Sequence, residues 1–96
     1  MPAKVSADGF AKKFFQAESK DDRWVGSLRG EFSTWGQELI ERYSTAPKMG
    51  MKARKAFVRE YLAEKTVGNP ILGVVLSILV PLFLRLLESW LNRESA

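Results

Sequence analysis

The sequence contains no cysteine and no histidine. Without cysteine, the chain has no disulfide, no thiolate ligand for a metal ion and no thiol nucleophile. Without histidine, it lacks the residue that most often transfers protons near neutral pH and binds metal ions. No serine has a plausible base beside it, and no carboxylates follow the spacing of metal ligands. We therefore expect a protein that is not an enzyme, has no catalytic or metal-binding residues and uses no cofactor.

The chain is also short and unevenly charged. With 96 residues, it buries only a modest hydrophobic core, so we expect it to rely on a membrane, a partner or copies of itself. Its 15 basic and 11 acidic residues leave a net charge of +4. Residues 1–45 carry seven basic and seven acidic groups, whereas residues 46–65 carry six and two. The whole excess of positive charge therefore lies in residues 46–65.

A run of 19 residues without any charge, residues 66–84, follows the basic segment. As a helix it would be about 28 Å long, close to the thickness of a bilayer's hydrocarbon core. It shows no polar face at helical spacing, unlike the helices of soluble proteins. The run predicts a transmembrane helix over residues 66–92, with Trp90 as an anchor at the headgroup level and residues 93–96 as a short tail.

A second interpretation of this run stays open. Residues 71–91 can instead form the buried helix of a soluble helical oligomer, in a protein–protein interface, with the basic residues binding an acidic partner. In either case the small residues Gly73, Ser77 and Pro81 recur every four positions, which lets two helices approach closely. The spacing predicts a helix–helix interface on this face, and Pro81 predicts a kink.

The flanking charges predict an orientation in the membrane. Six basic residues lie within about 20 residues before the run, and two lie after it. Basic flanks stay on the cytoplasmic side of a membrane. We therefore expect the N-terminus on the cytoplasmic side of a cell's inner membrane, or on the interior side of a virion membrane.

We expect residues 1–45 to form a helical N-terminal region with an aromatic stripe. Ser6 or Asp8 can cap a first helix that carries Phe10, Phe14 and Ala17 on its apolar side, with Phe15 pointing elsewhere. A second helix carries large apolar residues at steps of three and four, which predicts the buried side of a helical core. These residues are Trp24, Leu28, Phe32, Trp35, Leu39 and Tyr43.

Residues 46–65 read as a basic amphipathic helix beginning near Pro47. Four cations at steps of four, three and four predict one basic side: Lys48, Lys52, Lys55 and Arg59. Beside a membrane, such a side binds anionic lipid headgroups. It can equally hold the phosphates of a nucleic acid, or remain a solvated face without a ligand.

These patterns together predict an all-α protein. Two to three amphipathic helices precede one C-terminal hydrophobic helix that crosses the membrane. The expected function is a structural or assembly role in a small single-pass membrane protein that self-associates or binds a protein partner. Its size and layout suit a virion or phage membrane component or a holin-like protein, by analogy alone.

Overall fold

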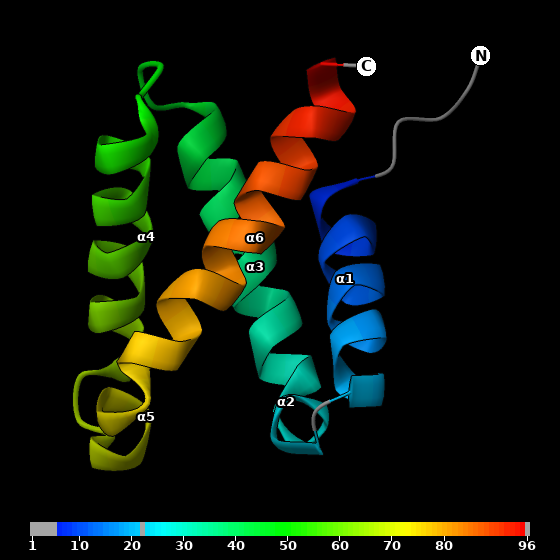
Figure 1. Ribbon diagram of the computed structural model, residues 1–96, viewed down its shortest axis with the longest axis vertical. Helices are drawn as coiled ribbons and strands as arrows, with labels where there is room; N and C mark the ends of the chain where they lie inside the picture. Colours follow the sequence, from blue (N-terminus) through cyan, green and yellow to red (C-terminus); the bar gives the residue numbers. More distant parts are fainter. Residues whose placement is uncertain (1–5, 22, 96) are drawn as a thin grey trace. The chain divides into compact units, whose positions relative to one another are not determined.

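The computed structural model describes residues 6–21 and 23–95 of the chain (Figure 1). Over these residues the structure is all-α, with 86% helix and no strand, as the sequence predicted. The helices are α1 (Ala7–Asp21), α2 (Arg23–Ser27), α3 (Arg29–Ser44), α4 (Met51–Thr66), α5 (Pro70–Val74) and α6 (Leu76–Ser95). The chain divides between Thr45 and Ala46 into two compact units.

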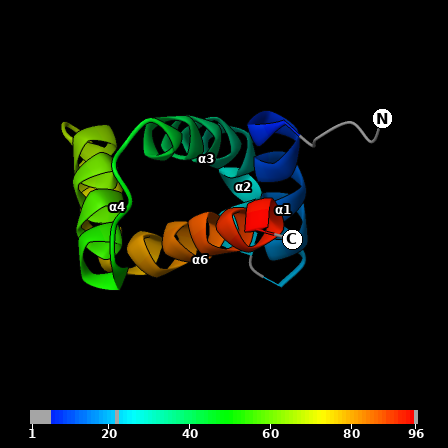
Figure 2. The same ribbon diagram turned by 90° about the horizontal axis from the view of Figure 1, so that it is seen from above.

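In the first unit, α1 packs beside α3 (Figure 2). The hydroxyl of Ser6 accepts a hydrogen bond from the Gly9 N–H at 3.1 Å and so caps α1, one of the two caps predicted. Ala11 and Phe15 are fully buried, and the Phe15 ring lies 5.7 Å from the Phe32 ring of α3. Phe32 is also fully buried, so this ring pair joins α1 to α3 within the first unit's core.

The predicted apolar side of α1 was wrong. Phe15 is buried, whereas Phe10 and Phe14 are only half-buried. Residues 10 and 14 have the same four-residue spacing as residues 11 and 15, so periodicity favours neither pair. The packing of α1 against α3 selects the second pair, which contains the small residue Ala11.

The aromatic stripe is divided between two helices. α2 ends at Ser27 and α3 begins at Arg29, so the predicted single helix is interrupted at Leu28. Of the stripe, Phe32, Leu39 and Tyr43 are buried, and Leu28 and Trp35 are half-buried. The side chain of Trp24 lies outside the described part of the structure. α3 also buries Ser33, Gly36 and Ile40, which the stripe did not include.

In the second unit, α4 packs along α6. α4 begins at Met51 after an extended Gly50, not at Pro47 as predicted, so Lys48 precedes the helix. α4 buries Val58 and Leu62 on one face, and α6 buries a face that includes Leu79, Phe83 and Leu86. Their spacing is that of amphipathic helices, each with one apolar side.

The uncharged run does not form the single helix expected over residues 66–92. α4 continues to Thr66, and a turn at Val67 and Gly68 follows. Asn69 caps α5 by accepting a hydrogen bond from the Leu72 N–H at 3.3 Å, and Val75 separates α5 from α6. Gly68 has a φ of 83°, a conformation that ends helices and that glycine adopts without strain.

No helix in the described residues is both long enough and apolar enough to cross a membrane, so the predicted C-terminal transmembrane helix is not supported.

The core of the first unit can be tested with two neighbouring phenylalanines. We expect Phe15→Ala to lower the free energy of unfolding by about 3–4 kcal/mol, because it leaves a cavity in place of a fully buried ring. Phe14→Ala removes the same atoms from a half-buried position, so we expect less than about half that loss. Urea denaturation followed by circular dichroism measures both. A larger loss for Phe14→Ala would contradict this packing.

The turn before α5 gives a second test. Gly68→Ala places a side chain at a positive φ, so we expect it to lower the free energy of unfolding by about 1–2 kcal/mol. Gly73→Ala is the matched control, because Gly73 is helical and a Cβ there meets no atom within 4 Å. We expect this control to be neutral or to stabilise by up to about 1 kcal/mol. If both changes altered the free energy of unfolding equally in urea denaturation, the positive φ of Gly68 in this turn would be contradicted.

Candidate functional site

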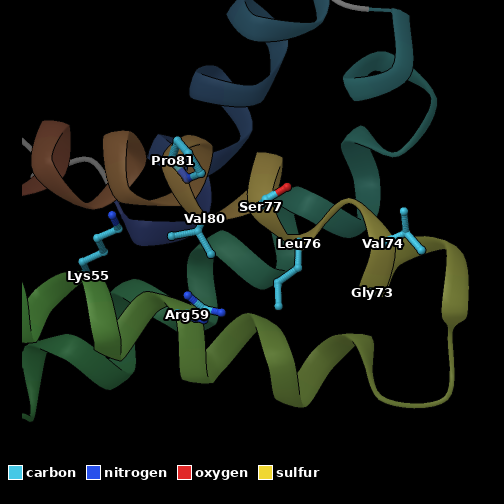
Figure 3. Close-up of a pocket in the computed structure, with 8 residues that line it drawn as sticks. All are labelled: Lys55, Arg59, Gly73, Val74, Leu76, Ser77, Val80 and Pro81. Carbon is cyan, nitrogen blue, oxygen red and sulfur yellow. The ribbon is translucent and has the colours of Figure 1, made fainter.

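A pocket of about 400 Å³ opens between α4 and the α5–α6 segment of the second unit (Figure 3). We call it the α4–α6 pocket. It is lined by Lys55, Arg59, Gly73, Val74, Leu76, Ser77, Val80 and Pro81.

The pocket has two chemically different walls. Lys55 and Arg59 are one helical turn apart on α4, and Figure 3 shows both side chains extending from α4 toward α6. The opposite wall is mainly apolar, with Val80 buried, Leu76 half-buried and Ser77 supplying one hydroxyl. An arrangement of this kind can hold an anionic group on one side and hydrocarbon on the other.

The two cations of the pocket have no ion-pair partner among the described residues, and both are exposed. Like charges one turn apart on a helix repel each other, so Lys55 and Arg59 slightly destabilise α4 when no anion lies between them. An anion bound to both side chains would remove this repulsion.

Arg54, the neighbouring cation on α4, is bonded within the protein instead. Its Nη1 donates to both carboxylate oxygens of Glu88 at 2.7 Å, and its Nη2 donates to the Met49 carbonyl at 3.1 Å. Hydrogen bonds between an arginine and a carboxylate are short and directional. This ion pair links α4 to α6 and so holds the two walls of the pocket together.

The stretch from the turn after α4 to the first turn of α6 also exposes large apolar side chains. They are Val67 (81% exposed), Ile71 (72%), Val74 (81%) and Ile78 (58%). Val74 belongs to this group and also lines the pocket. Single exposed apolar residues are common on protein surfaces, but four within residues 67–78 make this segment markedly more apolar than an ordinary exposed segment.

The pocket brings together residues of two predicted features, the basic side and the helix–helix interface. Lys55 and Arg59 belong to the predicted basic side, and Gly73, Ser77 and Pro81 are the whole of the predicted helix–helix interface. Lys48 and Lys52 are exposed but do not line the pocket.

Other features of the site had no signal in the sequence. The pairing of Arg54 with Glu88 joins residues far apart in the chain, and Leu76 and Val80 line the pocket although no pattern in the sequence marked them. Trp90, the predicted membrane anchor, is half-buried on α6.

A smaller cavity of about 210 Å³ lies in the first unit, between α1 and α3. One of its cations, Lys12, is 3.3 Å from the carboxylate of Asp8. The charge of Lys12 is therefore balanced within the protein, although Arg29 also lines this cavity. The α4–α6 pocket has about twice the volume and two cations one turn apart, so it is the stronger candidate.

The chain matches no known protein-family model, and no significant match was found among curated proteins or solved structures.

The ion pair that links α4 to α6 can be tested directly. We expect Glu88→Gln to lower the free energy of unfolding by about 1–2 kcal/mol, because Arg54 and Glu88 are only 20% and 30% exposed and share two hydrogen bonds. Lys12→Gln breaks an ion pair whose side chains are 62% and 45% exposed, so we expect a loss below about 0.5 kcal/mol. Urea denaturation compares them, and an equal loss would mean that the Arg54–Glu88 pair does not hold the helices together.

Proposed function

We propose that this protein is a non-enzymatic, membrane-associated protein with a structural or assembly role, and that its second unit binds anionic lipid. The proposal is supported by the α4–α6 pocket, where Lys55 and Arg59, which have no ion-pair partner among the described residues, share the lining with the 81% exposed Val74. Proteins that bind at the surface of an anionic bilayer combine the same two features.

The energies explain why both features are needed. Each lysine or arginine near an anionic membrane surface contributes about 1 kcal/mol. The four exposed cations of the predicted basic side therefore contribute about 4 kcal/mol together, which corresponds to a dissociation constant of about 1 mM. Such binding is weak. Insertion of exposed apolar side chains into the lipid supplies the remaining affinity, at about 25 cal/mol for each Å² of apolar surface removed from water.

The proposal has two forms, which differ in how deeply the protein inserts into the membrane. In the interfacial form, α4 and α6 stay paired, and Val74 and Ile78 enter the headgroup region. In the spanning form, residues 66–92 rearrange into one helix, with the N-terminus inside and Trp90 at the opposite headgroup layer. The interfacial form is favoured, because it keeps the Arg54–Glu88 pair and the cap at Asn69.

A second candidate is a helical oligomer that binds an acidic partner and buries residues 71–91 between its subunits. Exposure of Ile71, Val74 and Ile78 supports it. The surface available for such an interface is limited, because Leu79, Phe83 and Leu87 of the same segment are already buried within one chain.

Vesicle sedimentation tests the proposal. We compare vesicles in which about a quarter of the lipid is phosphatidylglycerol and the rest phosphatidylcholine with vesicles of pure phosphatidylcholine. We expect the protein to bind the anionic vesicles at least about tenfold more tightly. High salt should weaken this binding. Replacing Lys48, Lys52, Lys55 and Arg59 together by glutamine should remove this preference.

As a control, Lys12→Gln with Lys13→Gln removes two cations of the first unit and should leave the preference in place. Equal binding of the wild-type protein to the two kinds of vesicle would refute the proposal. A wild-type protein that binds duplex DNA, but neither kind of vesicle, would identify phosphates of a nucleic acid as its target. An alkaline carbonate wash releases the interfacial form and retains the spanning form.

A further inference from the structure

The α4–α6 pocket differs from the rest of the basic surface in one respect. Lys55 and Arg59 face an apolar wall across a cavity, whereas Lys48 and Lys52 lie outside it. A flat anionic surface can use all four cations alike, but only Lys55 and Arg59 can hold a ligand that also enters the pocket.

The cationic wall suits a phosphate. The guanidinium of Arg59 can donate two parallel hydrogen bonds to phosphate oxygens, and the ammonium of Lys55 adds a point charge one turn away. Neither side chain must first leave an ion pair within the described structure. A doubly charged group between them would also end their mutual repulsion.

The opposite wall suits the hydrocarbon and linker of an amphiphile. Val80 and Leu76 offer apolar surface at the base of the pocket. Pro81 has no N–H to donate to the carbonyl of Ser77, which therefore lacks its usual helix partner. The Ser77 hydroxyl can donate a hydrogen bond to an ester oxygen between a headgroup and its acyl chains, whereas the Ser77 carbonyl can only accept one.

The pocket is open and large enough for part of a lipid. A volume of about 400 Å³ lies within the range of small-molecule sites. A Cβ at Gly73 would meet no atom within 4 Å, so nothing closes the pocket at that residue. The exposed side chain of Val74 continues the apolar lining to the surface. Acyl chains can therefore extend from the pocket.

We propose that the α4–α6 pocket binds a single anionic phospholipid, with its phosphate held between Lys55 and Arg59 and the start of its acyl chains against Leu76 and Val80. This inference rests on the proposed membrane function and deepens it. The second unit then recognises one lipid molecule by its headgroup, in addition to the charge of the surface.

Titration calorimetry with short-chain lipids that stay monomeric tests the pocket without a membrane. We expect dihexanoyl phosphatidic acid to bind at one site per chain, at least about tenfold more tightly than dihexanoyl phosphatidylcholine or inorganic phosphate. Inorganic phosphate binding as tightly would mean a site for a free anion. Phosphatidylcholine binding as tightly would mean an apolar site alone. Either result, or no binding of phosphatidic acid, would overturn the proposal.

Two charge-matched double variants separate the pocket from the basic surface. Lys55→Gln with Arg59→Gln should weaken binding of dihexanoyl phosphatidic acid at least about tenfold. Lys48→Gln with Lys52→Gln removes the same charge outside the pocket and should change it less than about threefold. Circular dichroism checks that both variants fold. Equal losses for the two would show that the lipid responds only to net charge.

The two proposals can fail separately. If the wild-type protein binds phosphatidylglycerol vesicles but not monomeric phosphatidic acid, the pocket proposal is wrong and the membrane function stands. If it binds phosphatidic acid but no vesicle, the membrane function is wrong and the pocket is a site for a free lipid. Nuclear magnetic resonance shifts of the Gly73 and Ser77 amides on lipid addition would locate binding in the pocket, and shifts confined to the first unit would refute it.

Discussion

The pairing of α4 with α6 is the interaction on which the second unit depends. The chain has no cysteine for a disulfide and no histidine for a metal ion that would join these helices. Instead, each helix buries one apolar face, and Arg54 spans from α4 to both carboxylate oxygens of Glu88. The pocket exists because this pairing places Lys55 and Arg59 opposite Leu76 and Val80. Loss of the pairing would separate the basic helix α4 from the apolar wall of the α5–α6 segment, and no pocket would remain between them.

Composition and periodicity were sufficient to predict helices and their general character. The spacing of apolar residues predicted the all-α fold, and the clustering of charge predicted which segment is basic. They were not sufficient to choose between adjacent faces of one helix. Phe10 with Phe14 and Ala11 with Phe15 have equal spacing, and only contact with α3 decides that Phe15 is buried. This choice depends on residues distant in the sequence.

The uncharged run, residues 66–84, is a second case in which the pattern of the sequence was not sufficient to predict the structure. Hydropathy averages over residues 66–84 and treats them as one apolar helix. The backbone responds to individual residues: Gly68 takes a positive φ, and Asn69 with Pro70 starts a new helix. These residues turn the chain back toward α4, so that α6 buries part of the run against its own chain and leaves Ile71, Val74 and Ile78 exposed. The local signals were visible in the sequence, but their effect on topology was not.

The pocket brings Lys55 and Arg59 of the predicted basic side together with the small residues Gly73, Ser77 and Pro81 of the predicted helix–helix interface. Small residues bring helices together, but beside two cations they also leave room for a ligand. A second copy of the chain that packed on this face would bring another Lys55 and Arg59 close to the first pair, with no anion to balance them. Such an interface is unfavourable without an intervening negative charge. An anionic lipid supplies that charge together with hydrocarbon for the apolar wall, so lipid binding would come before any self-association through this face.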